Sequence, residues 1–208
     1  NVTELTSIIG QDIQNWEVNE VGDGNLNLVF IVKSPVGSVI VKQALPYVRL
    51  VGDSWPLPLY RAYFEYNALT RQSTRTNDTI PAIYYFDNDQ AMIIMEYLTP
   101  HKILREKLIL GEKVKKLAEQ LGDFCAKTAF RGSDLSMKTA QVKSDRALFS
   151  GNIEIPAITE SLVFCDPYFE AEMNSHTPEL SPIVRLLRSD VDMKSRVQHF
   201  FRLYSAQQ

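Results

Sequence analysis

Cysteine and histidine are scarce in this sequence and follow no metal-binding or catalytic pattern. The 208 residues include two cysteines, Cys125 and Cys165, and three histidines. Neither cysteine belongs to a Cys-x-x-Cys pair or lies beside a histidine, which argues against a zinc site and against a cysteine nucleophile. A single disulfide or two free thiols would fit the pattern, and the lack of an export signal favours two buried free thiols.

The sequence also lacks a strong net charge and a long apolar run. Lysine and arginine number 22 and aspartate and glutamate 25, a net charge of −3, so no basic surface for nucleic acid or membrane is indicated. No apolar stretch reaches the roughly 18 residues of a membrane-spanning helix, and the N-terminus shows no signal-peptide core. We therefore expect no nucleic-acid or membrane partner and a cytoplasmic location.

Hydrophobic residues make up 45% of the chain, enough for a real core, and their pattern changes near residue 100. Before that point, short apolar runs between polar turns predict strands; after it, helical spacing predicts helices. We predict an α+β fold, with an antiparallel β-sheet lobe carrying one helix at residues 1–99 and a helical segment at residues 100–208. The predicted helices of this segment cover residues 113–130, 138–148, 156–163 and 183–204.

The segment VGDGNLNLVFIV, residues 21–32, places two glycines and an asparagine at a turn between apolar runs. Gly22 and Gly24 can adopt φ > 0 and bring backbone N–H groups close to phosphate oxygens, and Asn25 adds an amide donor. The turn at residues 35–37 then predicts a β-hairpin. An ordinary hairpin turn is the alternative for the glycines, because Asp-Gly and Gly-Asn are common hairpin residues.

Lys42 ends the next apolar run, SVIVKQA. A glycine loop that precedes a strand lysine by one hairpin is the arrangement in which a protein-kinase-like lysine reaches nucleotide phosphates. The alternative is a lysine whose stem is buried and whose ammonium lies in water. The sequence contains no GxxxxGK[ST] segment, so this is not a Walker A loop.

Glu65 is the predicted partner of Lys42. The segment DSWP at residues 53–56 is predicted to begin a helix, and Glu65 falls near the apolar stripe of that helix. A kinase lysine is held by such a glutamate. Alternatively, Glu65 pairs on the helix surface with Arg61 or Arg71, and such pairs are weak. The stripe consists of apolar side chains at helical spacing: Leu59, Ala62, Tyr66 and Leu69.

The pattern of residues 81–98 predicts a strand, a polar turn and a second strand. The second strand ends in Glu96, Tyr97 and Leu98, where a connector to the helical segment begins. Kinase-type folds recognise adenine through backbone groups at such a connector. A buried strand that simply ends here is the alternative.

Asp166, in the segment DPYF, stands in a context that kinase-like folds use for magnesium. A catalytic loop with another aspartate should precede it, but no HRD-like or HGD-like segment occurs. We interpret Asp166 as the end of a helix. Asp134 and Asp145 also lack the surrounding residues of a kinase catalytic loop or magnesium motif. We therefore predict no metal ligand and no catalytic residue within the chain.

Several strings together resemble one family, the bacterial and plant 5-methylthioribose kinases. They are VGDGNLNLVFIV, VIVKQALPYVRLVGD with SWPL, RAYFEYNAL and IIMEYL. The resemblance extends over essentially the whole chain, with the most specific strings in residues 16–100. It implies the protein-kinase-like fold of aminoglycoside phosphotransferases and choline kinases.

The resemblance implies transfer of the γ-phosphate of ATP to the 1-hydroxyl of 5-methylthioribose, with Mg²⁺, in methionine salvage. It places Asn25 on the nucleotide, Lys42 on its phosphates and residues 96–98 at the adenine edge. Trp55 would close over the sugar substrate or, alternatively, anchor a packed loop. A homodimer is implied as well.

The sequence departs from this family because it has no HGDLH-type loop, DPEF-type motif or substrate-binding arginine pair. We therefore expect the N-terminal half of a kinase, inactive in isolation, with the catalytic base beyond Gln208. Two alternatives stay open: a kinase for another hydroxyl acceptor, such as an aminoglycoside, choline or homoserine, and a non-catalytic nucleotide-binding module.

Overall fold

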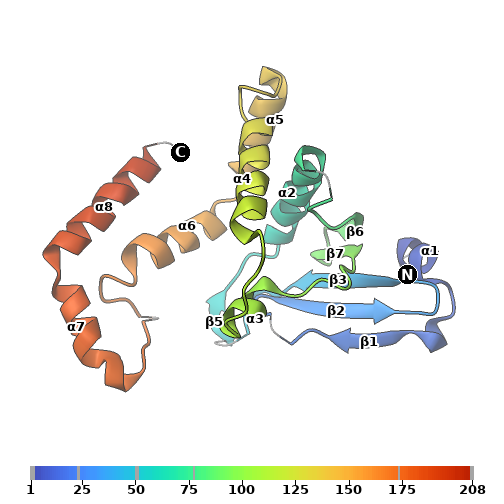
Figure 1. Cartoon of the computed structure of the whole chain (residues 1–208), viewed down its shortest axis with the longest axis horizontal. Helices are drawn as coiled ribbons and strands as arrows, with labels where there is room; N and C mark the ends of the chain where they lie inside the picture. The colour runs from blue at the N-terminus through green and yellow to red at the C-terminus, as the bar shows by residue number, and fades with distance from the viewer. Residues whose placement is uncertain (1–2, 23, 50–51, 77, 173, 207–208) are drawn as a thin grey trace. The chain divides into compact units, whose positions relative to one another are not determined.

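The computed structural model describes residues 3–22, 24–49, 52–76, 78–172 and 174–206 (Figure 1). The chain divides into two compact units, Asn1–Gly151 and Asn152–Gln208. The sheets and the helices α1 to α5 belong to the first unit, and the described elements of the second are all helical. The predicted lobe boundary at residues 99 and 100 lies inside the first unit and stays a prediction.

A five-stranded antiparallel sheet organises the first unit, in the order β1-β2-β3-β7-β6. Its strands are β1 (Glu17–Glu20), β2 (Asn27–Lys33), β3 (Ser38–Ala44), β6 (Ile83–Asp87) and β7 (Met92–Glu96). A separate pair consists of β4 (Tyr47–Val48) and β5 (Gly52–Pro56). The helices of this unit are α1 (Thr3–Ile9), α2 (Arg61–Arg75), α3 (Leu104–Ile109), α4 (Leu117–Arg131) and α5 (Thr139–Phe149).

The central strand β3 has one helix on each face of the sheet, because successive strand residues point to opposite sides. Val39 is fully buried in a cluster with Ile9 of α1, and Ala44 is buried in another cluster with Ala62 of α2. Sequence patterns predicted α2 but not α1. Its seven residues form less than two turns, and only the contact of Ile9, Leu5 and Ile8 with the sheet cluster marks the helix, which no local pattern shows.

The hairpin between β2 and β3 forms as predicted. Its turn is closed by a hydrogen bond from the Ser34 N–H to the Gly37 carbonyl, 2.8 Å long. A Cβ on Gly37 would lie 2.7 Å from the Ile8 carbonyl oxygen. Glycine is therefore required at this turn by the close approach of the α1 backbone.

The predicted helix start at residues 53–56 is wrong. Residues Gly52–Pro56 form strand β5, and α2 begins at Arg61. Two prolines, Pro56 and Pro58, explain the difference, because a residue before proline is disfavoured in the helical region and favours extended backbone.

The predicted helices after residue 100 are found with shifted ends. α4 begins at Leu117 rather than at residue 113, and α5 nearly matches its predicted range. The second unit contains α6 (Glu154–Glu160), a π-helical continuation (Ser161–Cys165), a short 3-10 helix (Pro178–Leu180), α7 (Ser181–Ser189) and α8 (Val191–Ser205). The single helix predicted at residues 183–204 is thus two helices. Asp190 separates them and caps α8, accepting a 2.8 Å hydrogen bond from the Met193 N–H.

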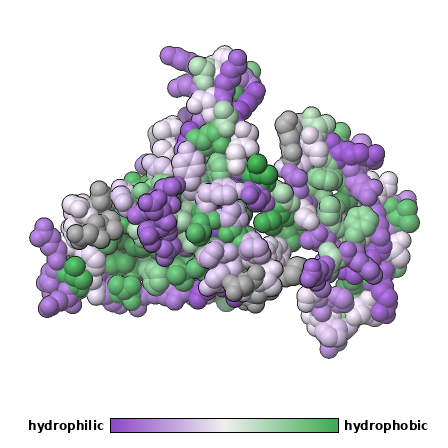
Figure 2. All heavy atoms as spheres, turned by 180° about the vertical axis from the view of Figure 1, so that it is seen from behind, coloured by the Kyte–Doolittle hydropathy of each residue, from purple (hydrophilic) through white to green (hydrophobic). Residues whose placement is uncertain are grey.

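The α+β fold class is confirmed, with an antiparallel sheet first and helices after it. Both cysteines are free, as expected, but neither is buried as predicted: Cys125 is exposed and Cys165 is half-buried. Large apolar side chains also stay on the surface of each unit, Leu135 in the first and Val191 in the second, and Figure 2 shows apolar and hydrophilic side chains interspersed. Within the described part of the chain, no helix is both long and apolar enough to cross a membrane.

Candidate functional site

The glycine loop joins β1 to β2, and its base is closed by a 2.8 Å hydrogen bond from the Val21 N–H to the Val29 carbonyl. Asp23 lies outside the described residues. Gly22 and Gly24 do not adopt the positive φ that the sequence analysis considered for them. A Cβ on Gly24 would lie 3.0 Å from the Asn27 carbonyl oxygen, whereas one on Gly22 would meet nothing within 4 Å. The close backbone approach therefore concerns Gly24 alone.

The tip of this loop is tied to neighbouring elements through its backbone, and the Asn25 side chain is exposed. The Asn25 carbonyl accepts a 2.8 Å hydrogen bond from the Arg49 N–H. The Leu26 carbonyl accepts one from the Leu45 N–H, 3.2 Å long, and another from the Arg61 guanidinium. The loop is thus fixed by its main chain while the Asn25 amide faces solvent.

Lys42 lies in the central strand, opposite Val29 on β2 and Ile93 on β7. Cross-strand neighbours lie close enough to pack against its stem, and its side chain is 24% exposed. The Nζ atom donates to Oε1 of Glu65, which is 34% exposed. Of the two alternatives for Glu65, the structure contains the ion pair with Lys42.

Arg61 and Arg71, the alternative partners of Glu65, have other roles. Arg61 donates from Nη1 to the Pro58 carbonyl, 2.9 Å away, and from Nη2 to the loop. Burial lowers the pKa of Arg61, and the charge of Glu65 opposes that shift. Arg71 points to Asp145 instead. The hydrogen bond between Arg61 and the glycine loop was not predicted, because no local sequence pattern relates residues so far apart.

Residues 96–98 form the end of β7 and the connector that follows. Glu96 pairs with Ala82 twice: its N–H donates to the Ala82 carbonyl at 2.8 Å, and its Oε2 accepts from the Ala82 N–H at 3.0 Å. The ring of Tyr97 lies 5.6 Å from the Lys33 ammonium, and Leu98 is 41% exposed. The Glu96 side chain is therefore occupied within the sheet.

Glu96 and Leu98 also line a cavity of about 1140 Å³ alongside β6 and the last turns of α2. Neither Lys42 nor the described part of the glycine loop belongs to its lining. The cavity is consequently separate from the Lys42–Glu65 pair.

Trp55 is half-buried on β5, in the two-stranded sheet with β4. Leu57 follows directly after the strand, and its N–H donates to the Pro46 carbonyl over 2.9 Å. A strand position suits a packed anchor as well as a residue that contacts a substrate, and both alternatives stay predictions.

Asp166 directly follows the π-helical stretch, as the prediction of a helix end requires. Its Oδ1 accepts a 2.8 Å hydrogen bond from the Ser161 hydroxyl, and its carbonyl accepts one from the Asn174 amide. No cluster of three or more His, Cys, Asp or Glu side chains suited to a metal ion occurs among the residues with described positions.

The chain is similar over most of its length to several methylthioribose kinases. It is 50% identical over 182 residues to that of Escherichia coli O45:K1, covering 86% of this chain and 43% of the relative. With methylthioribose kinase 2 of Oryza sativa subsp. japonica it shares 42% identity over 195 residues, covering 93% and 46%. The enzyme of Geobacillus kaustophilus is 44% identical over 173 residues, covering 82% and 43%. The chain therefore spans less than half the length of these relatives.

No protein-family model matches the chain. A solved structure from Thermobifida fusca YX-ER1, whose description suggests a fructosamine-3-kinase, aligns with 62% of this chain and 38% of its own. The TM-score is 0.40 and the sequence identity 19%, which is too low a similarity to support an assignment.

Proposed function

The chain is a homologue of methylthioribose kinases over most of its length, and on that premise we propose that it forms the ATP-binding part of such an enzyme. The whole enzyme would transfer the γ-phosphate of ATP to the 1-hydroxyl of 5-methylthioribose, a step of methionine salvage. The observation that carries this proposal is the ion pair between Lys42 of β3 and Glu65 of α2, one hairpin after the glycine loop.

Lys42 would contact the phosphates of ATP. Glu65 holds its ammonium in place, and the Lys42 side chain as a whole is 24% exposed. Phosphoryl transfer relies on positioning and on stabilising the charge of the transferred group. A lysine already oriented by a carboxylate does not have to be ordered when the nucleotide arrives. The exposed amide of Asn25 would add a donor from the loop.

The adenine would lie at residues 96–98. Because the Glu96 N–H already donates to Ala82, the backbone of Tyr97 and Leu98 would make the adenine contacts. Glu96 would support this connector through its two hydrogen bonds to Ala82.

Magnesium would enter with the phosphates of ATP, since Mg²⁺ in kinases is commonly held by substrate phosphates and one or two carboxylates. When bound, it would neutralise charge on those phosphates. The described residues show no cluster of side chains suited to a metal ion, so we propose no metal ligand among them.

Trp55 is proposed to contact the sugar substrate.

Replacing Lys42 tests the nucleotide site. We expect Lys42→Met to weaken ATP binding by about 10- to 100-fold, because a charge-assisted hydrogen bond contributes roughly 1.5–3 kcal/mol. Isothermal titration of the 208-residue chain measures this. The matched control is Lys127→Met, since Lys127 forms an exposed ion pair with Asp123. Equal affinity of Lys42→Met and the wild type would remove the phosphate role.

A second assay tests which hydroxyl acceptor is phosphorylated, and it uses a full-length protein that contains this sequence. Phosphorylation of 5-methylthioribose in preference to choline, homoserine and an aminoglycoside is the expected result. Preference for one of the other acceptors would overturn the substrate assignment. ATP binding without transfer to any acceptor would favour a non-catalytic module.

A further inference from the structure

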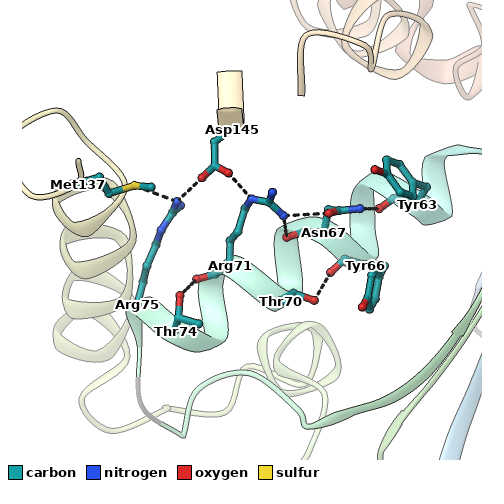
Figure 3. A network of polar contacts seen from close by, with 9 residues as sticks. All are labelled: Tyr63, Tyr66, Asn67, Thr70, Arg71, Thr74, Arg75, Met137 and Asp145. Atoms are coloured by element: carbon teal, nitrogen blue, oxygen red, sulfur yellow. Dashed lines mark hydrogen bonds and ion pairs between the residues drawn. The ribbon is translucent and has the colours of Figure 1, made fainter. Parts of the chain in front are cut away.

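Two arginines of α2 share one carboxylate of α5, within the first unit (Figure 3). Asp145 accepts a hydrogen bond from Nε of Arg71 at 2.5 Å through Oδ1, and from Nη2 of Arg75 at 2.9 Å through Oδ2. We call Arg71, Arg75 and Asp145 the α2–α5 clamp. All three side chains are between 19% and 24% exposed, so solvent screens the clamp less than a surface ion pair.

Other contacts reinforce the clamp. The Phe149 ring of α5 lies 5.3 Å from the Arg71 guanidinium and 6.4 Å, centroid to centroid, from the Phe64 ring of α2. The Arg75 carbonyl accepts a hydrogen bond from the guanidinium of Arg131 on α4. α2 is therefore held along its length by side chains that follow residue 100 in the sequence.

Helix geometry relates the clamp to Glu65. Successive residues of an α-helix are rotated by about 100°, which places Phe64, Arg71 and Arg75 within about 40° of one another. The face they form is rotated about 100° from Glu65. Glu65 thus lies beside the clamped face and does not take part in the clamp.

The opposite side of α2 is fixed to the sheet. Ala62 is buried against Ala44 and Ala91, and the Tyr66 ring stacks on Phe86 with centroids 4.6 Å apart. Contacts on two sides fix both the rotation of α2 about its axis and its position along that axis. Both quantities determine whether the Glu65 carboxylate reaches Lys42.

We propose that Asp145 is a positioning residue for the Lys42–Glu65 pair and acts through α2. Without the Asp145 carboxylate, Arg71 and Arg75 present two neighbouring positive charges on one helix face, which repel each other. α2 then loses its attachment to α5, and Glu65 spends less time on Lys42. The consequence for ATP binding rests on the proposed function, whereas the consequence for Lys42 does not.

The reactivity of Lys42 tests the proposal directly. The 208-residue chain is acylated with a limiting amount of an N-hydroxysuccinimide ester, and modification of Lys42 is quantified by peptide mass spectrometry. Glu65→Gln is the reference in which Lys42 has lost its carboxylate. We expect Asp145→Asn to raise the Lys42 labelling rate by about threefold or more, the size expected when a half-buried ion pair loosens.

Asp134→Asn is the matched control. Asp134 pairs with Arg146, also on α5, but this ion pair is 61–72% exposed, so its loss should leave Lys42 labelling at the wild-type rate. Asp145→Glu, which retains the carboxylate, should restore slow labelling in part. If circular dichroism shows that Asp145→Asn is unfolded, Arg75→Gln replaces it, because that change removes one of the two bonds to Asp145.

Two outcomes decide the matter separately. Wild-type Lys42 labelling in the folded clamp variants, with faster labelling in Glu65→Gln, would refute the positioning role whatever the chain binds. Failure of the wild-type chain to bind ATP would count against the proposed function and leave the labelling result interpretable. If Asp145 positions Glu65 and the chain binds ATP, Asp145→Asn weakens ATP binding whereas Asp134→Asn does not.

Discussion

At the residue scale, the ion-pair partner of Glu65 is decided by what the neighbouring cations bind. Three cations, Lys42, Arg61 and Arg71, are near enough in sequence or space to be its partner. Arg71 is held by Asp145, and Arg61 is committed to backbone carbonyls around the glycine loop. Lys42 forms the ion pair with Glu65. Both arginines hydrogen-bond to other acceptors, whereas the strand lysine donates to the Glu65 carboxylate.

Gly37 offers a test of the packing between the sheet and α1. Gly37→Ala should destabilise the chain by roughly 1–3 kcal/mol, the usual cost of overpacking, because its Cβ would lie 2.7 Å from a backbone oxygen. Gly22→Ala is the control, since its Cβ would meet nothing within 4 Å. Urea denaturation followed by circular dichroism measures both. Equal midpoints for the two variants would contradict the close approach.

At the scale of elements, prolines and caps decide where the helices begin and end. Pro56 and Pro58 keep the segment before α2 extended, so the polar residues that suggested a helix start belong to β5 instead. Asp190 interrupts an apolar stripe that would otherwise suit one long helix, and its side chain caps α8. In both places local chemistry overrides hydrophobic periodicity.

The cap of α8 can be measured by substitution. Asp190→Ala removes the acceptor of the Met193 N–H and should destabilise the helix by about 1 kcal/mol, while Asp190→Asn keeps an acceptor and should change little. Hydrogen exchange of the first-turn amides of α8 reports the difference. Equally fast exchange in Asp190→Asn and Asp190→Ala would mean that the side-chain oxygen does not cap the helix.

At the scale of the whole molecule, the proposed nucleotide-binding residues and the clamp all belong to the first unit, Asn1–Gly151. The main sheet, both of its covering helices and α5 are in that unit too. The second unit consists of helices with their own aromatic contacts, such as the stacked rings of Phe164 and Phe201, 5.0 Å apart.

This division predicts that residues 1–151 fold and bind ATP by themselves. A domain with its own core can fold alone, and we expect the ATP affinity of the shorter chain to lie within about threefold of that of the 208-residue chain. Thermal unfolding and isothermal titration of both chains provide the comparison. A non-cooperative melt of residues 1–151 would show that the first unit depends on the second.

Much of the candidate site was predictable because it follows from short-range patterns. The apolar runs predicted β2 and β3, and the helical stripe predicted α2. Together they placed Lys42 on a strand and Glu65 on a helix. The hydrogen bond from Arg61 to the glycine loop and the role of Asp145 were not predictable. In the sequence, Asp145 is an ordinary polar helix residue, and only the packing of α5 against α2 gives it two arginine partners.

The sequence alone thus determined the α+β class, the order of the main elements and the placement of Lys42 on a strand and Glu65 on a helix, since periodicity and turn residues act over a few positions. Only the tertiary structure decided which cation Glu65 binds, how α1 covers the sheet and how Asp145 fixes α2. These contacts join residues far apart in the chain. Their formation depends on packing of several elements at once, which no local pattern of residues encodes.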